Sequence, residues 1–252
     1  MRQRSSASKQ VILVLAASLG VAAPAAAQKT INQAKAVTGG VTPGDAPGFP
    51  VTISTPGSYK LAGNLTVTDV DTHAIHITAP NVTLDLNGFR IDGPSAPGAG
   101  IGIFSGQFEG GGTTVVNGTV AEFGSGGVFL LSGSNRVESV RVIGNGGRGI
   151  FVGDNSVVAG CLAKFNGYAG ITIGSGTVTG NTAESNGVYG ISASAATVVN
   201  NSVRQNGSHG MWLGNSGYAH NVLSENNAGG AQVTGGVQMG AGTNICNGAP
   251  CP

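Results

Sequence analysis

The densest group of residues capable of acid–base chemistry lies in the segment Asp69-Val70-Asp71-Thr72-His73. Carboxylates beside an imidazole can transfer protons or bind a cation. The same residue types also suit a polar turn between two strands, which requires no chemistry of them. We keep Asp69, Asp71 and His73 as catalytic candidates and favour the turn.

A second kind of candidate is a set of aromatic side chains. Phe129, Phe151 and Trp212 each lie between two apolar residues, and the alternation of a strand then directs them outward. Exposed rings can stack on sugars, so we keep Phe129, Phe151 and Trp212 as candidates for ligand binding. Alternatively, a loop over residues 104–113 covers the two phenylalanines. The outward column is predicted to contain His76, Gly102, Phe129, Phe151, Thr172, Ser192, Trp212 and Gln232.

Metal ligands are sparse in this sequence. Calcium uses about six to eight oxygen ligands, and the acidic residues of the C-terminal half form no cluster along the chain. Three methionines and four histidines offer few ligands for copper. The sequence therefore predicts no metal site and no cofactor.

The three cysteines indicate two different roles. Cys246 and Cys251 flank the turn-forming segment Asn-Gly-Ala-Pro and form a plausible disulfide in an exported protein. Cys161 lies inside the repeat described next and is predicted to be a buried, apolar residue.

These candidates are carried by an internal repeat of about twenty residues. One glycine recurs at intervals of 22, 21, 20, 20 and 20 residues, and two asparagine series share its register. The glycines are Gly127, Gly149, Gly170, Gly190, Gly210 and Gly230; the asparagines are Asn145, Asn166, Asn186, Asn206 and Asn226, with Asn181, Asn201 and Asn221.

Each repeat indicates short strands joined by tight corners. Ile171 and Ile173 alternate with Thr172, which is typical of a strand with one buried face. Glycine and asparagine tolerate the left-handed backbone of corners, and stacked asparagine amides can hydrogen-bond along the axis. We therefore predict an all-β, right-handed parallel β-helix solenoid of about 8–10 rungs of 20–22 residues.

The chain divides into four predicted segments. Residues 1–27 combine a basic start, an apolar run and Ala25-x-Ala27, which is typical of a secretory signal peptide. An irregular lead-in is expected at 28–50, the β-helix at 51–245 and a tail at 246–252. Val51–Ile53 and Tyr59–Leu61 are expected to form a hairpin or a first rung that caps the N-terminal end.

Charge argues against a polyanionic partner. The chain has 12 basic and 11 acidic residues, and removal of a signal peptide with three basic residues leaves a net charge of about −2. No basic surface for nucleic acid or an anionic membrane is expected. We expect no stable membrane span after signal cleavage, because the apolar run is shorter than the about 20 residues that a span needs.

The Gly-Ile-x-Ile and Asn-x-x-x-x-Asn patterns, with Asn81-Val-Thr-Leu-Asp-Leu-Asn-Gly-Phe89, resemble right-handed parallel β-helix repeat proteins. These belong to the pectate-lyase-like superfamily, and the patterns are similar to its periplasmic copper-accessory (NosD-like) and uncharacterised exported groups. The resemblance implies the fold more than a function. We expect a secreted or periplasmic, non-catalytic protein whose extended face binds polysaccharide or an envelope protein. The alternative is a lyase, hydrolase or epimerase that acts on uronate-type glycans through a divergent active site. Of these, only the lyase would use Ca²⁺.

Overall fold

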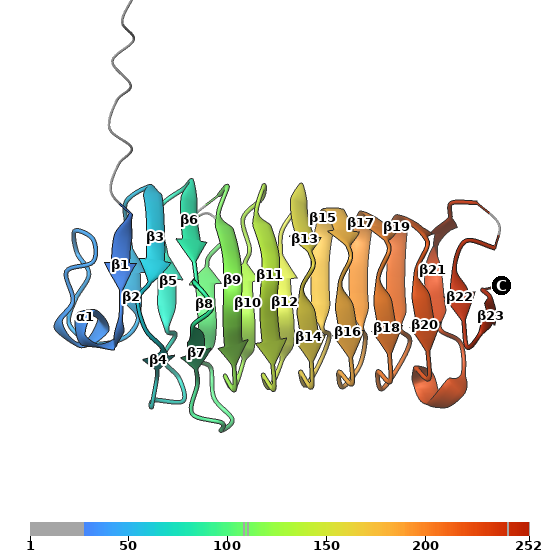
Figure 1. Ribbon diagram of the computed structural model, residues 1–252, viewed down its shortest axis with the longest axis horizontal. Helices are drawn as coiled ribbons and strands as arrows, with labels where there is room; N and C mark the ends of the chain where they lie inside the picture. Colours follow the sequence, from blue (N-terminus) through green and yellow to red (C-terminus); the bar gives the residue numbers. More distant parts are fainter. Residues whose placement is uncertain (1–27, 108, 110, 241, 252) are drawn as a thin grey trace, which may run out of the picture.

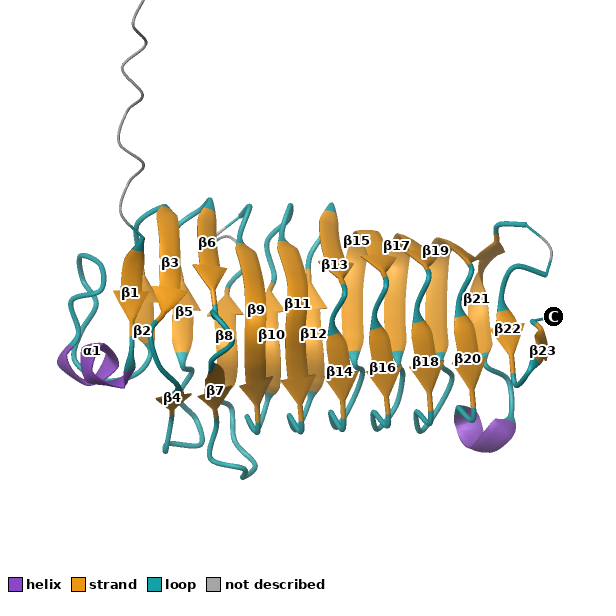
Figure 2. Cartoon of the chain, viewed as in Figure 1, coloured by secondary structure: helices purple, strands orange, loops and turns teal. Residues whose placement is uncertain are grey.

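The chain folds into a parallel β-solenoid of about nine turns (Figure 1). The computed structural model describes residues 28–107, 109, 111–240 and 242–251. The expected signal peptide at 1–27 lies outside the described residues. The predicted fold class and number of rungs are confirmed. The rungs stand side by side along one axis, and helical segments occur only near the two ends of the described chain (Figure 2).

The strands form three faces along this axis. The first face contains β2 (Val51–Ile53), β5 (Ile75–Ile77), β8 (Ile101–Ser105), β10 (Gly126–Leu130), β12 (Arg148–Val152) and the first halves of β15 (Ile171–Thr179), β17 (Ile191–Val199), β19 (Met211–Ala219) and β21 (Val233–Gln238). The second contains β1 (Lys29–Ile31), β3 (Gly57–Leu61), β6 (Val82–Asp85), the first halves of β9 (Thr114–Ala121) and β11 (Arg136–Ile143), β13 (Ser156–Ala159) and the second halves of β15, β17, β19 and β21. The third contains β4 (Leu65–Thr66), β7 (Arg90–Asp92), the second halves of β9 and β11, β14 (Leu162–Lys164), β16 (Thr182–Glu184), β18 (Ser202–Arg204), β20 (Val222–Ser224) and β22 (Ile245–Cys246).

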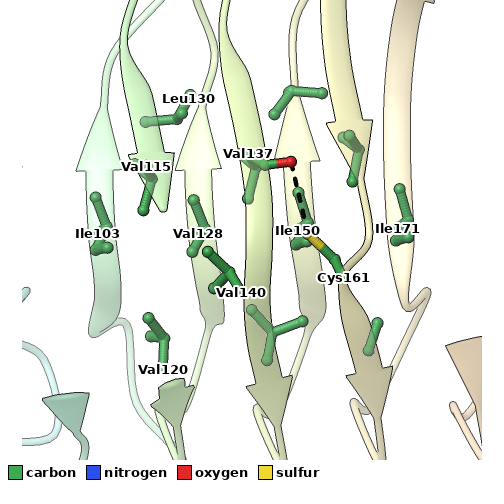
Figure 3. Close-up of a cluster of buried hydrophobic side chains, with 14 of the residues drawn as sticks. Ile103, Val115, Val120, Val128, Leu130, Val137, Val140, Ile150, Cys161 and Ile171 are labelled. Carbon is green, nitrogen blue, oxygen red and sulfur yellow. Dashed lines mark hydrogen bonds between the residues drawn. The ribbon is translucent and has the colours of Figure 1, made fainter. Parts of the chain in front are cut away.

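The core is a stack of apolar columns inside the solenoid. Alternate residues of each strand point inward, and parallel pairing places equivalent residues of successive rungs in contact. One such column consists of Ile103, Val128, Ile150 and Ile171, and all four residues are fully buried (Figure 3). Cys161 lies inside the same core, as predicted, with its thiol directed at the Val137 carbonyl.

Two asparagine ladders run along the interior at the corners. In the first, each amide Nδ2 donates to the Oδ1 of the next rung at 2.7–3.0 Å. Each Oδ1 also accepts a backbone N–H, so the ladder satisfies corner groups that would otherwise be buried and unpaired. The predicted structural role of the asparagines is confirmed. The ladders comprise Asn145, Asn166, Asn186, Asn206 and Asn226, ending on Gln232, and Asn181, Asn201, Asn221 and Asn244.

The repeat glycines have a different role from the one expected. Gly190 is not in the left-handed region; a β-carbon there would lie 2.7 Å from the Asn206 amide nitrogen. The left-handed corner residue instead precedes each ladder asparagine, and it is Ser185, Gln205 or Glu225 in successive rungs. Glycine is therefore required by the close approach of the strand to the asparagine ladder.

The segment 28–50 is not an irregular lead-in. It contains β1, which pairs in parallel with β3, and helix α1 (Gln33–Thr38), which lies at the N-terminal end of the solenoid (Figure 2). The strands β2 and β3 form a first rung and not a hairpin, because they pair with β5 and β6 rather than with each other.

Side chains replace the missing neighbour of β2 at this end. The Asp45 carboxylate accepts the backbone N–H groups of Val41 and Thr52 at 2.9 and 2.6 Å. The Thr42 hydroxyl donates to the Thr52 carbonyl and accepts the Ser54 N–H. The sheet edge is thereby hydrogen-bonded and closed.

The C-terminal end is covered by a short hairpin. After β22 the chain reverses into β23 (Ala249–Pro250), the antiparallel partner of β22, and a disulfide joins Cys246 to Cys251. The short helix η1 (Asn227–Gly229) lengthens the preceding rung. Within the part of the chain that is described, no helix is long and apolar enough to span a bilayer.

Candidate functional site

The outward column of the first face is more aromatic than the sequence indicated. Pairing places Phe104, and not Gly102, beside Phe129, because Gly102 aligns with the repeat glycine Gly127. At the other end Thr234, and not Gln232, follows Trp212, because η1 lengthens that rung. The observed column is His76, Phe104, Phe129, Phe151, Thr172, Ser192, Trp212 and Thr234.

The three predicted binding residues belong to one continuous row. Phe129 and Phe151 pack edge to face with their ring centroids 5.7 Å apart. Further along, Tyr189 lies 6.4 Å from Trp212, centroid to centroid, and Trp212 keeps 41% of its surface exposed.

Arg148 and Tyr168 connect the two ends of this row. The Arg148 guanidinium carbon lies 5.0 Å from the Phe151 centroid and 4.7 Å from the Tyr168 centroid, so the cation stacks between two rings. Tyr168 lies 6.0 Å from Tyr189. We call these residues the aromatic row: Phe129, Phe151, Arg148, Tyr168, Tyr189 and Trp212.

Sequence reasoning missed Arg148, Tyr168 and Tyr189. They lie where the chain enters the first face, one or two positions before a repeat glycine: Arg148 begins β12, and the two tyrosines lie in turns. Their signal was the recurrence of large side chains one or two positions before Gly149, Gly170 and Gly190.

Two adjoining clefts follow the aromatic row and are open to solvent. One has a volume of about 530 Å³ and is lined by Arg148, Phe151, Tyr168, Tyr189 and Trp212 among others. The other has about 470 Å³ and is lined by Gln107, Phe151 and Asp154 among others. Both include Phe151 and Gly174, and we call the pair the aromatic groove.

The loop that was expected to cover the phenylalanines begins later than predicted. Phe104 and Ser105 still belong to β8. The Glu109 carboxylate accepts the Gly106 N–H and contacts His76 Nε2, each at 2.9 Å, which holds the loop to the rung of His76. Phe129 and Phe151 remain half-exposed.

The candidates Asp69, Asp71 and His73 lie together before β5, and each binds the backbone. Asp69 Oδ1 accepts the Asp71 N–H at 2.9 Å, which lowers the pKa of Asp69. Asp71 Oδ1 accepts the Ala99 N–H at 2.8 Å. His73 Nδ1 accepts the Ile101 N–H at 3.0 Å, and burial lowers the pKa of His73. Asp71 and His73 thus attach this segment to the start of β8 and the chain before it, while Asp69 closes a turn within the segment.

Two other cavities are less suited to a ligand. One, of about 480 Å³, lies beside Ser95 and Glu122, but the Glu122 carboxylate already binds Arg90 and Ser95. The other, of about 400 Å³, lies at the C-terminal end beside Tyr218 and the disulfide. Among the described residues, no group of three His, Cys, Asp or Glu side chains is placed to hold a metal ion. Burial raises the pKa of the Cys161 thiol to about 11, which keeps it protonated.

The fold and the groove define a class, the solenoids that present a long sheet face to solvent. The chain belongs to the family described as right-handed β-helix region, whose model matches residues 53–194 and 100–245. A search of curated proteins found no match.

Two solved structures are similar to this chain. One is the mannuronan C-5 epimerase AlgE4 A-module of Azotobacter vinelandii, at 12% identity and a TM-score of 0.48, covering 77% of this chain and 75% of that one. The other is the AlgE6 A-module of the same organism, at 14% identity and a TM-score of 0.36, covering 76% and 68%. Likeness at this level concerns the fold and carries no argument about activity.

Proposed function

We propose that this protein binds a polysaccharide along the aromatic groove and catalyses no reaction on it. The observation that carries the proposal is the aromatic row, which spans β10 to β19 on an open sheet face. With a rung spacing of about 4.8 Å, four rung steps extend about 19 Å. An extended chain with flat apolar sugar faces matches a row of rings at this spacing.

The composition of the groove favours a glycan over an envelope protein. Its rings alternate with Arg148, Thr172 and Ser192, so hydroxyl and cationic groups interrupt the apolar surface. Aromatic residues and Arg are enriched in protein interfaces too, whereas Ser is depleted there, so the polar Ser192 beside the rings is the feature that favours a glycan. If no glycan binds and the protein captures an envelope protein through residues of the aromatic groove, the partner is a protein instead.

The rival proposal is an enzyme acting on uronate-type glycans through Asp69 and Asp71. Their hydrogen bonds to backbone amides support a structural role instead. Incubation with a panel of uronate polymers, with and without Ca²⁺, separates the two proposals. If a product forms and Asp71→Asn abolishes its formation, the enzyme proposal replaces the proposal of a non-catalytic binding protein.

Export to the periplasm or beyond the cell forms part of the proposal. It is supported by the signal-type sequence at 1–27 and by the disulfide, since disulfides persist in oxidising compartments. Cell fractionation and alkylation of the free thiols test it. A cytoplasmic protein with three reactive cysteines after denaturation contradicts it.

The binding test replaces single rings of the groove. After a polysaccharide array identifies a ligand, Phe151→Ala and Trp212→Ala should each weaken binding at least tenfold, which is about 1.4 kcal/mol. Phe165→Ala is the matched control, because Phe165 is an aromatic residue that is 57% exposed and lines neither cleft. Equal affinities for all four proteins would contradict the proposal.

A further inference from the structure

Two uncompensated charges of opposite sign lie in the aromatic groove. Among the described residues, which include every acidic residue of the chain, Asp154 is the acidic side chain with neither a hydrogen bond nor an ion pair. The others bind a backbone amide, a polar side chain or a cation. A carboxylate without such a partner is available to a ligand.

Asp154 lies where a ligand in the groove would meet it. It is exposed in the turn between β12 and β13 and lines the cleft that also contains Phe151. Its carboxylate extends toward Gly174 of the next rung, where a β-carbon would collide with Oδ1. The glycine therefore leaves room for the carboxylate beside the groove floor.

Arg148 supplies the opposite charge on the other side of Phe151. Its guanidinium stacks between Phe151 and Tyr168, and its Nε is buried without a hydrogen-bond acceptor. The guanidinium stays charged at any physiological pH, and buried donors in folded proteins are almost always paired. The described residues contain no carboxylate in an ion pair with Arg148. Arg148 thus has no compensating anion among the described residues, and it lines the open cleft, where an anionic group of a ligand can reach its guanidinium.

We propose that the groove selects a glycan in which an acidic sugar adjoins a sugar with a free amine. This inference rests on the proposed function and specifies its ligand. The acid group pairs with Arg148 and the amine with Asp154, while rings of the row stack on the faces of these two sugars. A uniformly acidic polymer would bring a negative charge against Asp154, and a neutral one would leave both charges unpaired, so both are disfavoured.

The test compares two polymers that differ only at the amine. N-deacetylated heparosan alternates glucuronic acid with glucosamine, and its N-acetylated parent has the same acids without the positive charge. Affinities are measured by isothermal titration at one ionic strength, because screening weakens exposed pairs. The deacetylated polymer should bind about two- to fivefold more tightly, the range for a partly exposed ion pair.

Two charge-removing variants assign the effect to its residues. Asp154→Asn should remove the preference for the amine, so that the two polymers bind this variant with equal affinity. Arg148→Gln should weaken binding of both polymers. Equal affinity of the native protein for the two polymers, or a preference that survives Asp154→Asn, overturns the inference.

Failure of the inference is distinguishable from failure of the proposed function. If neither heparosan binds but another glycan does so in a Phe151- and Trp212-dependent manner, the function stands and the charge selection is wrong. If no glycan binds in that manner, both are wrong.

Discussion

Replacing Asn186 with alanine tests how much the asparagine ladders stabilise the solenoid. Asn186 lies in the middle of the first ladder and is buried. Its Oδ1 accepts the backbone N–H of Asn166 at 3.1 Å and the side-chain amide of Asn166 at 3.0 Å. Its own Nδ2 donates to Asn206 Oδ1 at 2.9 Å and to the Ala163 carbonyl at 3.2 Å.

The expected loss of stability follows from the groups left without partners. Asn206 Oδ1 keeps the backbone N–H of residue 186 as a donor. The two donors on Asn166, however, lose their acceptor inside the core. At about 1–3 kcal/mol for each buried donor left unpaired, the substitution should lower the free energy of unfolding by about 2–6 kcal/mol.

Urea unfolding followed by far-UV circular dichroism measures this loss. Ser202→Ala is the control, because Ser202 is exposed on β18 and a surface substitution of this kind changes stability by about 0.5 kcal/mol or less. The double variant Asn166→Ala/Asn186→Ala adds a second check. It removes one of the orphaned donors, so its loss should fall about 1–3 kcal/mol short of the sum of the single losses. A loss below about 1 kcal/mol for Asn186→Ala, or strict additivity, would refute the reasoning.

Three further outcomes are expected. Gly190→Ala should destabilise by about 1–3 kcal/mol, because its methyl group overpacks against the Asn206 amide; a thermal melt that matches the native protein contradicts this. Asp45→Ala should lower the free energy of unfolding by about 2–4 kcal/mol, because it leaves two backbone N–H groups at the N-terminal edge unpaired. Hydrogen exchange should accelerate first at β2. Asp45→Asn should lose less stability, since an amide oxygen remains, and equal losses for the two variants would contradict the role of Asp45 at this edge. Reduction of the C-terminal disulfide should destabilise the protein by at most about 2 kcal/mol, because the closed loop is short. Hydrogen exchange should increase at β22 and β23 and not in the rungs before β19. A loss of protection throughout the solenoid would show that the hairpin does more than cover the end.

The fold could be predicted from the sequence because two physical demands recur in every rung. A ladder amide needs another amide one turn away, and the strand beside it needs a residue without a side chain. These demands place asparagine and glycine at a constant interval, as in Asn186 to Asn206 and Gly190 to Gly210. The period is therefore visible without any structure, although the reason for the glycines was misjudged.

The candidate site was predictable only where the rung length is constant. Phe129, Phe151 and Trp212 were placed correctly on the outward column. Gly102 and Gln232 were misassigned because the rungs at both ends contain extra residues, and strand alternation propagates any error in register along the column. Arg148 was missed for a different reason, since this first residue of β12 takes its direction from the rings that it stacks between.

Because the interval is uniform, the length of the solenoid can change only by whole rungs if the register is kept. Ile171 and Ile191 are register partners on adjacent rungs, so removing residues 171–190 joins Gly170 to Ile191 at an equivalent position. Asn166 would then face Asn206, and Trp212 would lie one rung closer to Phe151. Duplication of the same twenty residues would place Trp212 one rung further away. The span between the two ends of the groove therefore changes in fixed increments of about 4.8 Å, so the number of rungs can match it to a ligand while the core columns and the asparagine ladder stay in register.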